Sequence, residues 1–394
     1  MPITERQLSQ DFGTKYSVLI VLLILLMQST MGELFYKANL LGIYGSEFLL
    51  LISVFIAVLY AMITATIPRA IDLITILLVA IGYLLYSIIW CHREFIWIAR
   101  QFAVFIYFST SLLGFWFAIK NHSNLNWNKI LIFFGIFGFA TTGLHIVAPF
   151  SPGHPGYVSY LMSLLGYGAA LYRCRGLITN LTFSGIALLL STFIGSTGFI
   201  VAPLAISASI WFLKYPRLRL PLLVTGTLIA ITSPFLMSGL RDGNAIWRFI
   251  YWFDILQSSY DRGYFLIGNG FGSPFMSEAG DNFERILSQV SGRANRDYQL
   301  MTVPPHNGIL TFLHLVGIIP VGILIWAFRN MLTTAIRTRH SDYHAIFSTL
   351  CGYMIIFVST QMSVTPYGAI IFWLVFGVTY GLSKSINTHS QLAK

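Results

Sequence analysis

Long apolar stretches fill most of the 394 residues of this chain, and they constrain its fold more than any other feature. A membrane-spanning helix needs about 20 predominantly apolar residues. Breaks at proline, glycine and charged residues divide the sequence into twelve candidate segments, at 15–31, 45–66, 71–91, 96–119, 127–148, 156–172, 176–194, 198–213, 219–237, 305–328, 344–363 and 366–383. The pattern predicts an all-α polytopic membrane protein with about twelve transmembrane helices.

The composition supports a membrane protein. Only 10% of the residues are charged and 56% are hydrophobic, whereas about 25% of a soluble domain is charged. Too little polar surface exists to cover a globule of this size in water, which excludes a soluble enzyme, a disordered chain and a nucleic-acid-binding domain. The three cysteines show neither CxxC nor metal-ligand spacing, so we expect neither a disulfide framework nor a zinc site. The sequence shows no other metal cluster, and we expect no metal and no cofactor.

The basic residues indicate the orientation of the helices. With the N-terminus in the cytoplasm, fifteen of the 24 Lys and Arg residues fall on short cytoplasmic segments and three on short outer segments. The other six lie in one long segment, which is exempt because long loops cross the membrane largely regardless of charge. We therefore predict cytoplasmic termini and three regions: helices one to nine (1–237), a large outer loop (238–304), and helices ten to twelve with a cytoplasmic tail (305–394).

The large loop contains many aromatic residues as well as charges. Residues 244–258 are predicted to form an amphipathic helix at the membrane surface, where Trp and Tyr are favoured. Seven acidic and six basic residues in the loop can pair with each other as a solvated cap. Arg248 is the exception, because it follows Trp247 and an arginine at membrane depth needs an anionic partner. A lipid diphosphate fits, since a guanidinium binds phosphate oxygens in pairs.

A second polar motif opens the tenth apolar segment. His306 and Asn307 follow two prolines, so we expect the prolines in the first turn and open N–H groups that attract an anion. The helix dipole should keep His306 neutral and able to accept a proton. A capping or packing role is the alternative for such a histidine. The glycine-rich segment 267–272 resembles a phosphate loop, but no strand precedes it, so a tight turn is the simpler interpretation.

Three segments in this order and spacing, Asn244–Trp252, Leu266–Gly272 and Pro305–Pro320, resemble the bacterial superfamily of O-antigen ligases and polysaccharide polymerases. The specific likeness covers about residues 240–322. It implies a multi-pass protein of the bacterial inner membrane whose large periplasmic loop contains short amphipathic helices. Such a protein transfers glycan from an undecaprenyl-diphosphate carrier to an acceptor on the periplasmic face, and its donor needs no nucleotide.

The resemblance also implies the site residues. His306 and Arg248 match the catalytic positions, and the expected substrate-binding residues are Asn307, Asn244, Trp247, Gly270 and Gly272. One position departs from the family pattern, because the S-R-G of many relatives reads Ser196, Thr197, Gly198 here. As a hypothesis, Arg241 replaces that missing arginine in a diphosphate clamp. His306 is expected to act either as a general base on the acceptor hydroxyl or as a hydrogen-bond donor to phosphate.

The sequence leaves several functions open. The pattern N-x-x-W-R-x-x-x-W is more similar to the polymerases, whose acceptor is another lipid-linked repeat unit, than to the ligases, whose acceptor is a lipid A core sugar. A chain-length regulator and membrane lipids are further expected partners. A flippase or transporter of lipid-linked glycan is the alternative from another class, but it usually needs ionisable residues at the midplane. A structural membrane subunit is a third interpretation, and it predicts tolerance to changes in the outer loop.

Overall fold

The structure is a computed structural model that describes residues 20–27, 39–40, 43–63, 70–91, 93–122, 124–147, 156–173, 182, 185, 197–226, 228, 243–275, 305–338, 340–360 and 366–392. Helices dominate these residues. Within them, the strands are a two-residue antiparallel pair, β1 (Asn39–Leu40) and β2 (Ile43–Tyr44). The predicted all-helical class is confirmed for this part of the chain.

The principal helices follow one another along the chain with short breaks. They are α3 (Gly45–Ile63), α4 (Ile71–Ile89), α5 (Phe95–Phe108), α6 (Thr110–Asn121), α7 (Trp127–Val147), α8 (Gly156–Arg173), α10 (Thr197–Lys214), the 3-10 turn η2 (Pro216–Leu218), α12 (Gly243–Asp261), α15 (Gly308–Val316), α16 (Ile318–Arg337), α17 (Ser341–Ser359) and α18 (Pro366–Leu392).

Several helices have the length and composition of membrane spans. Among the described residues five stretches qualify, at Ile71–Ile89, Phe95–Asn121, Trp127–His145, Ile318–Arg337 and Gly368–Thr388. Some of them expose large apolar side chains on the outside of the bundle, such as Leu78 (60% exposed) on α4 and Ile136 (67%) on α7. Apolar surface of this kind is stable in lipid and not in water, so these helices indicate a membrane protein. The number of twelve spans stays a prediction.

Two of the predicted spans are divided differently in the structure. The fourth remains one apolar stretch, Phe95–Asn121, but its helix is divided at Ser109 into α5 and α6. The Ser109 and Thr110 hydroxyls donate there to the carbonyls of Ile106 and Tyr107 and compete with the helical bonds. The tenth, predicted at 305–328, is wrong in its limits. Gly317 has φ 78° and ends α15, so the long apolar helix runs over Ile318–Arg337.

The bundle is held together by close helix contacts. The backbones of α6 and α18 meet where a Cβ on Gly377 would lie only 1.9 Å from the carbonyl oxygen of Ser111. Small residues of this type let membrane helices approach closely. An aromatic cluster joins α5, α15 and α18, with ring centroids 4.8 Å apart for Phe105 and Phe312 and 5.5 Å apart for Phe312 and Trp373. This cluster anchors α15 in the core.

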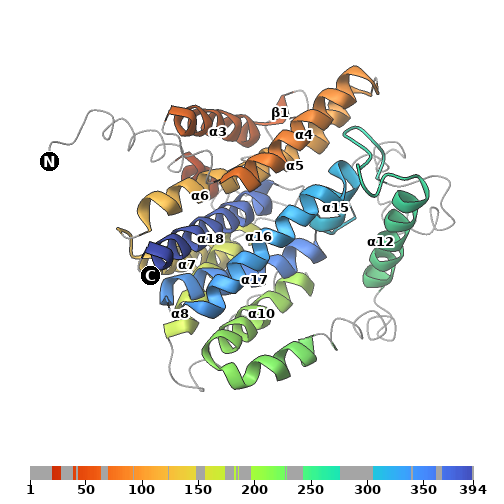
Figure 1. Cartoon of the computed structure of the whole chain (residues 1–394). Helices are drawn as coiled ribbons and strands as arrows, with labels where there is room; N and C mark the ends of the chain where they lie inside the picture. The colour runs from red at the N-terminus through yellow and green to blue at the C-terminus, as the bar shows by residue number, and fades with distance from the viewer. Residues whose placement is uncertain are drawn as a thin grey trace.

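The two ends of the bundle differ in what they carry. In Figure 1, α12 and the segment that follows it lie at one end, beside the end of α15, whereas the C-terminus lies at the other end. The predicted helix at 244–258 is confirmed as α12, Gly243–Asp261. Tyr251 and Ile255 form its buried face and Phe253 is exposed, which is the amphipathic pattern expected from the sequence.

Candidate functional site

The start of α15 and helix α12 are attached to each other. The indole N–H of Trp252 donates a hydrogen bond to the carbonyl oxygen of Pro305, one residue before His306. Tyr251 and Ile255 are fully buried on the inner face of α12. This attachment brings two motifs that are more than fifty residues apart in the sequence to one end of the bundle.

Arg248 lies on α12 and is half-buried. Its Nη1 donates to the carbonyl oxygen of Ser359, 3.2 Å away, at the last residue of α17. The carbonyl groups at the end of a helix carry partial negative charge, which favours a cation there. Arg248 therefore has a definite position between α12 and α17. Its charge also acts on the phenol of Tyr157, in the first turn of α8.

His306 precedes α15 and is partly exposed, outside the apolar helix that begins at Ile318. Burial, together with the positive charge of Arg248, lowers the pKa of His306 to about 3. The imidazole is therefore neutral at physiological pH, and Arg248 lies close enough to influence it. His306 also has φ 52°, and among the described residues it is the one non-glycine residue with a positive φ. Such a conformation costs about 1–3 kcal/mol and often occurs at functional sites.

Asn307 caps α15. Its side-chain oxygen accepts hydrogen bonds from the backbone N–H groups of Ile309 (3.0 Å) and Leu310 (3.2 Å). The expectation that these N–H groups are open to an anion is wrong, because the cap already satisfies them. The prolines also precede the helix instead of occupying its first turn, since α15 begins at Gly308. A contact of Asn307 with substrate stays a prediction.

The glycine-rich segment is a tight turn that caps the other end of α15. The backbone N–H groups of Asn269 and Gly270 donate to the carbonyl oxygens of His314 (2.7 Å) and Leu315 (3.0 Å). These carbonyls lie in the last turn of the helix, where intrahelical partners are missing. Gly268, Gly270 and Gly272 all have φ between 73° and 76°, a backbone conformation that glycine adopts without strain.

Two residues from the α4–α5 region hold the same turn. Arg93 Nη1 donates to the carbonyl oxygens of Asn269 (2.9 Å) and Phe271 (2.8 Å). Gln101 accepts a hydrogen bond from the Gly272 N–H at 2.7 Å. The amide groups of Gly270 and Gly272 thus serve the packing of the turn, and their contact with substrate stays a prediction.

The remaining predicted site residues are described only in part. Asn244 and Trp247 belong to α12 by their backbone. Arg241 lies outside the described residues, so its proposed replacement of the missing arginine stays a hypothesis. No three His, Cys, Asp or Glu side chains gather as metal ligands within the ranges that the structure describes. The expectation of a metal-independent reaction also stays a prediction.

Sequence reasoning did not identify Arg93, Gln101 or Tyr157 as neighbours of these motifs. The position of Arg93 could have indicated its role. Arg93 is one of three basic residues on the predicted short outer segments, where the charge bias disfavours lysine and arginine. An arginine retained against that bias needs a local partner, and the carbonyl oxygens of the glycine turn supply it. Gln101 and Tyr157 lie in apolar segments and carried no comparable signal.

Comparison with known proteins gives no family for this chain. No protein-family model matches the sequence. No curated protein matches it either. The function is therefore inferred from the site and from the sequence motifs.

Proposed function

We propose that this chain is a membrane glycosyltransferase that polymerises undecaprenyl-diphosphate-linked oligosaccharide repeat units on the periplasmic face of the bacterial inner membrane. The observation that carries the proposal is the hydrogen bond from Trp252 to the Pro305 carbonyl, which brings the helix of Arg248 to the residue before His306. A permanent cation and a neutral imidazole thus lie at one end of a bundle of apolar helices. The resemblance of the motifs around both residues to the polymerases supplies the substrate class.

Arg248 binds the diphosphate of the donor in this proposal. A guanidinium is always charged and presents five N–H donors in a planar fork that matches phosphate oxygens. The bond to the Ser359 carbonyl fixes its position before substrate arrives. A preorganised cation of this kind stabilises the negative charge that develops on the leaving diphosphate. Neither a nucleotide nor a metal is needed for this step.

His306 acts on the acceptor hydroxyl or on the phosphate. The hydroxyl oxygen forms a bond to the anomeric carbon, and the bond from that carbon to the phosphate oxygen breaks with its electron pair leaving on the diphosphate. As a general base, His306 takes the hydroxyl proton. In the other role, its N–H donates a hydrogen bond to a phosphate oxygen, and an oxygen of the leaving diphosphate takes the hydroxyl proton. A bound diphosphate raises the pKa of His306 from about 3, because an opposite charge nearby favours the imidazolium.

The distribution of basic residues supports the orientation of this site. Tyr157, which Arg248 influences, lies at the start of α8. Arg173 lies at the opposite end of α8, and Lys214 ends the neighbouring helix α10. Cytoplasmic ends retain lysine and arginine, so in this proposal the end with α12 faces the periplasm. Cytoplasmic termini stay the expectation from the sequence.

The test is a gel of surface polysaccharide from cells that lack this gene and are complemented with wild type, His306→Ala or Arg248→Ala. We expect a ladder of repeats with wild type and single-repeat caps on lipid A with the variants. Immunoblots of the membrane fraction control for protein amount. Arg262→Gln is the matched control and should restore the ladder, because Arg262 is exposed in the turn directly after α12.

Each other outcome has a definite meaning. Bare lipid A together with long carrier-linked polymer in the variants shows a ligase that transfers glycan to the lipid A core. A normal ladder with both variants rejects every transferase function. Loss of the ladder with Arg262→Gln as well shows that any change in this region is harmful, and it removes the specific role of Arg248.

A further inference from the structure

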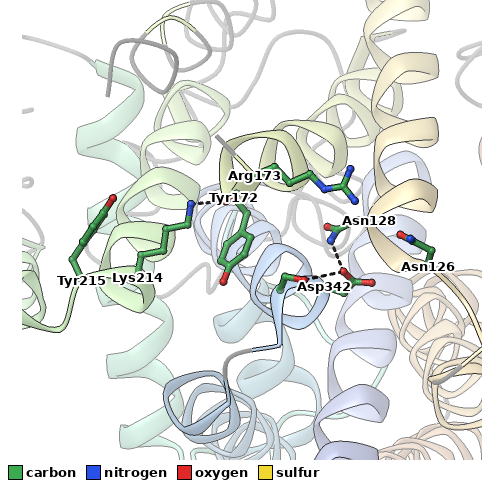
Figure 2. A pocket seen from close by; sticks show the side chains of 8 residues that line it. Asn126, Asn128, Tyr172, Arg173, Lys214, Tyr215 and Asp342 are labelled. Carbon is green, nitrogen blue, oxygen red and sulfur yellow. Dashed lines mark hydrogen bonds between the residues drawn. The ribbon is translucent and has the colours of Figure 1, made fainter. Parts of the chain in front are cut away.

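A polar pocket lies at the end of the bundle opposite to α12. Its volume is about 740 Å³, and it is formed where α8 and α10 end and where α7 and α17 begin (Figure 2). The residues that line it are Asn126, Asn128, Tyr172, Arg173, Lys214, Tyr215, Ser341 and Asp342. None of them belongs to the site at Arg248 and His306.

Two cations line this pocket. Within the described part of the chain, no hydrogen bond or ion pair involves the exposed guanidinium of Arg173. Lys214 is fixed by a hydrogen bond from its Nζ to the carbonyl oxygen of Tyr172 and by its position 4.6 Å from the centre of the Tyr172 ring. Both side chains therefore present positive charge to the pocket, one of them in a defined position.

An acidic group lines the same pocket without neutralising these cations. Asp342 accepts hydrogen bonds from Asn128 and from the Ser341 hydroxyl, and among the described residues it forms no ion pair. Asn128 is 3% exposed, and its side-chain amide oxygen is buried and receives no hydrogen bond from the described residues. The pocket thus combines the two cations with the carboxylate of Asp342, which lies on the same lining (Figure 2).

This combination selects the ligand chemistry. The cations require an anion such as a phosphate ester. A simple anion is repelled by Asp342, whereas a phosphate ester that also carries hydroxyl groups can donate hydrogen bonds to the carboxylate. A polyol phosphate satisfies both requirements, and it occurs either as a phospholipid headgroup or as a soluble ester.

The surroundings of the pocket favour the lipid. Tyr215 leads directly into η2 and helical residues 219–226, where Leu220 (71%) and Leu223 (57%) are largely exposed. Acyl chains can cover such apolar surface beside a headgroup site. We propose that this pocket binds the glycerol phosphate headgroup of an anionic phospholipid such as phosphatidylglycerol. The proposal is independent of the transferase reaction.

Native mass spectrometry of the full chain in detergent tests the proposal. Phosphatidylglycerol, phosphatidic acid, phosphatidylcholine and sn-glycerol 3-phosphate are titrated in parallel. We expect preferential binding of phosphatidylglycerol and a loss of about tenfold in affinity for Arg173→Gln and for Lys214→Gln. Arg217→Gln is the matched control, because Arg217 is exposed in η2 beside the pocket but does not line it.

Four results would overturn the proposal. Equal binding of phosphatidylcholine excludes an anion site, and equal loss with Arg217→Gln shows a general effect of charge. Binding of phosphatidic acid as tightly as phosphatidylglycerol excludes the hydroxyl contact at Asp342. Binding of glycerol phosphate without phosphatidylglycerol shows that the ligand is soluble. No hydrogen bond or ion pair within the described residues depends on the Arg173 side chain, so Arg173→Gln should keep the melting temperature of wild type. A thermal melt of the same samples checks this.

Discussion

His306 and His314 lie at opposite ends of the short helix α15. Both have a lowered pKa, but they differ in exposure, in backbone conformation and in their neighbours. Burial is the largest cause of the lowered pKa of both, to about 3, and a neighbouring arginine lowers each further. His314 is 4% exposed and contacts Asn269 (3.1 Å) and Ser273 (3.4 Å). His306 is partly exposed, in a left-handed backbone conformation beside Arg248.

The comparison shows that a lowered pKa does not by itself identify a catalytic histidine. Perturbed values also occur in buried structural networks. What separates the two residues is the surrounding surface, since His314 is enclosed by the glycine turn and the Phe275 ring, 5.0 Å away. We therefore assign His314 to the structure of the turn and propose His306 for the reaction.

The largest expected effect is that of His306→Asn. Asparagine tolerates the left-handed backbone better than other side chains, so this variant keeps the fold and removes the imidazole. We expect chain growth in membranes to fall by about a hundredfold or more, with an unchanged melting temperature. Near-normal chain growth at normal protein level would show that His306 is structural like His314.

Arg248→Lys tests the cation of the same region. Lysine keeps the charge but loses the planar fork that binds phosphate oxygens in pairs. We expect chain growth to fall by about tenfold to a hundredfold, mainly through weaker donor binding. The measurement is the rate of polymer formation at increasing donor concentration, and a rate that is unchanged at every concentration contradicts a role for the guanidinium.

His314→Gln should mainly affect stability. The change removes the ring contacts to Asn269, Ser273 and Phe275 in a buried site, where lost hydrogen bonds cost about 1–3 kcal/mol. We expect a lower melting temperature in detergent and less protein in the membrane, with activity per folded molecule close to that of wild type. The reverse pattern, full stability with lost activity, would exchange the roles of the two histidines.

The effect that is smallest at neutral pH concerns the titration of His306. Above about pH 6.5 His306 is neutral in the folded and unfolded states. As the pH falls from 6.5 towards 3, the unfolded state takes up a proton that the folded state excludes, so the stability of wild type decreases. Between pH 7 and 5 we expect the free energy of unfolding of His306→Asn to decrease by about 2 kcal/mol less than that of wild type. If the melting temperatures of wild type and His306→Asn change in parallel with pH, the imidazole of His306 is not buried and neutral in the folded protein.

Much of the local structure could be predicted from the sequence. The apolar stretches gave the helical class, and the alternation of aromatic and polar residues at 244–258 located α12. The predicted limits of the tenth span are wrong because hydropathy does not reveal a break at Gly317. The turn at Leu266 approaches Gly317 so closely that a Cβ on Gly317 would lie 2.2 Å from the Leu266 carbonyl oxygen. Asn307 was recognised at a helix start, but its capping of the N–H groups emerged only from the structure.

The sequence by itself determined that this chain is apolar and helical, with an aromatic-rich helix at 244–258, because hydropathy and periodicity are properties of neighbouring residues. The tertiary structure decided which distant groups meet. Arg93 reaches the carbonyl of Asn269, 176 positions away, and Arg248 reaches the end of α17. Such contacts depend on how whole helices pack, and that depends on side-chain shape across the bundle, which no local pattern contains.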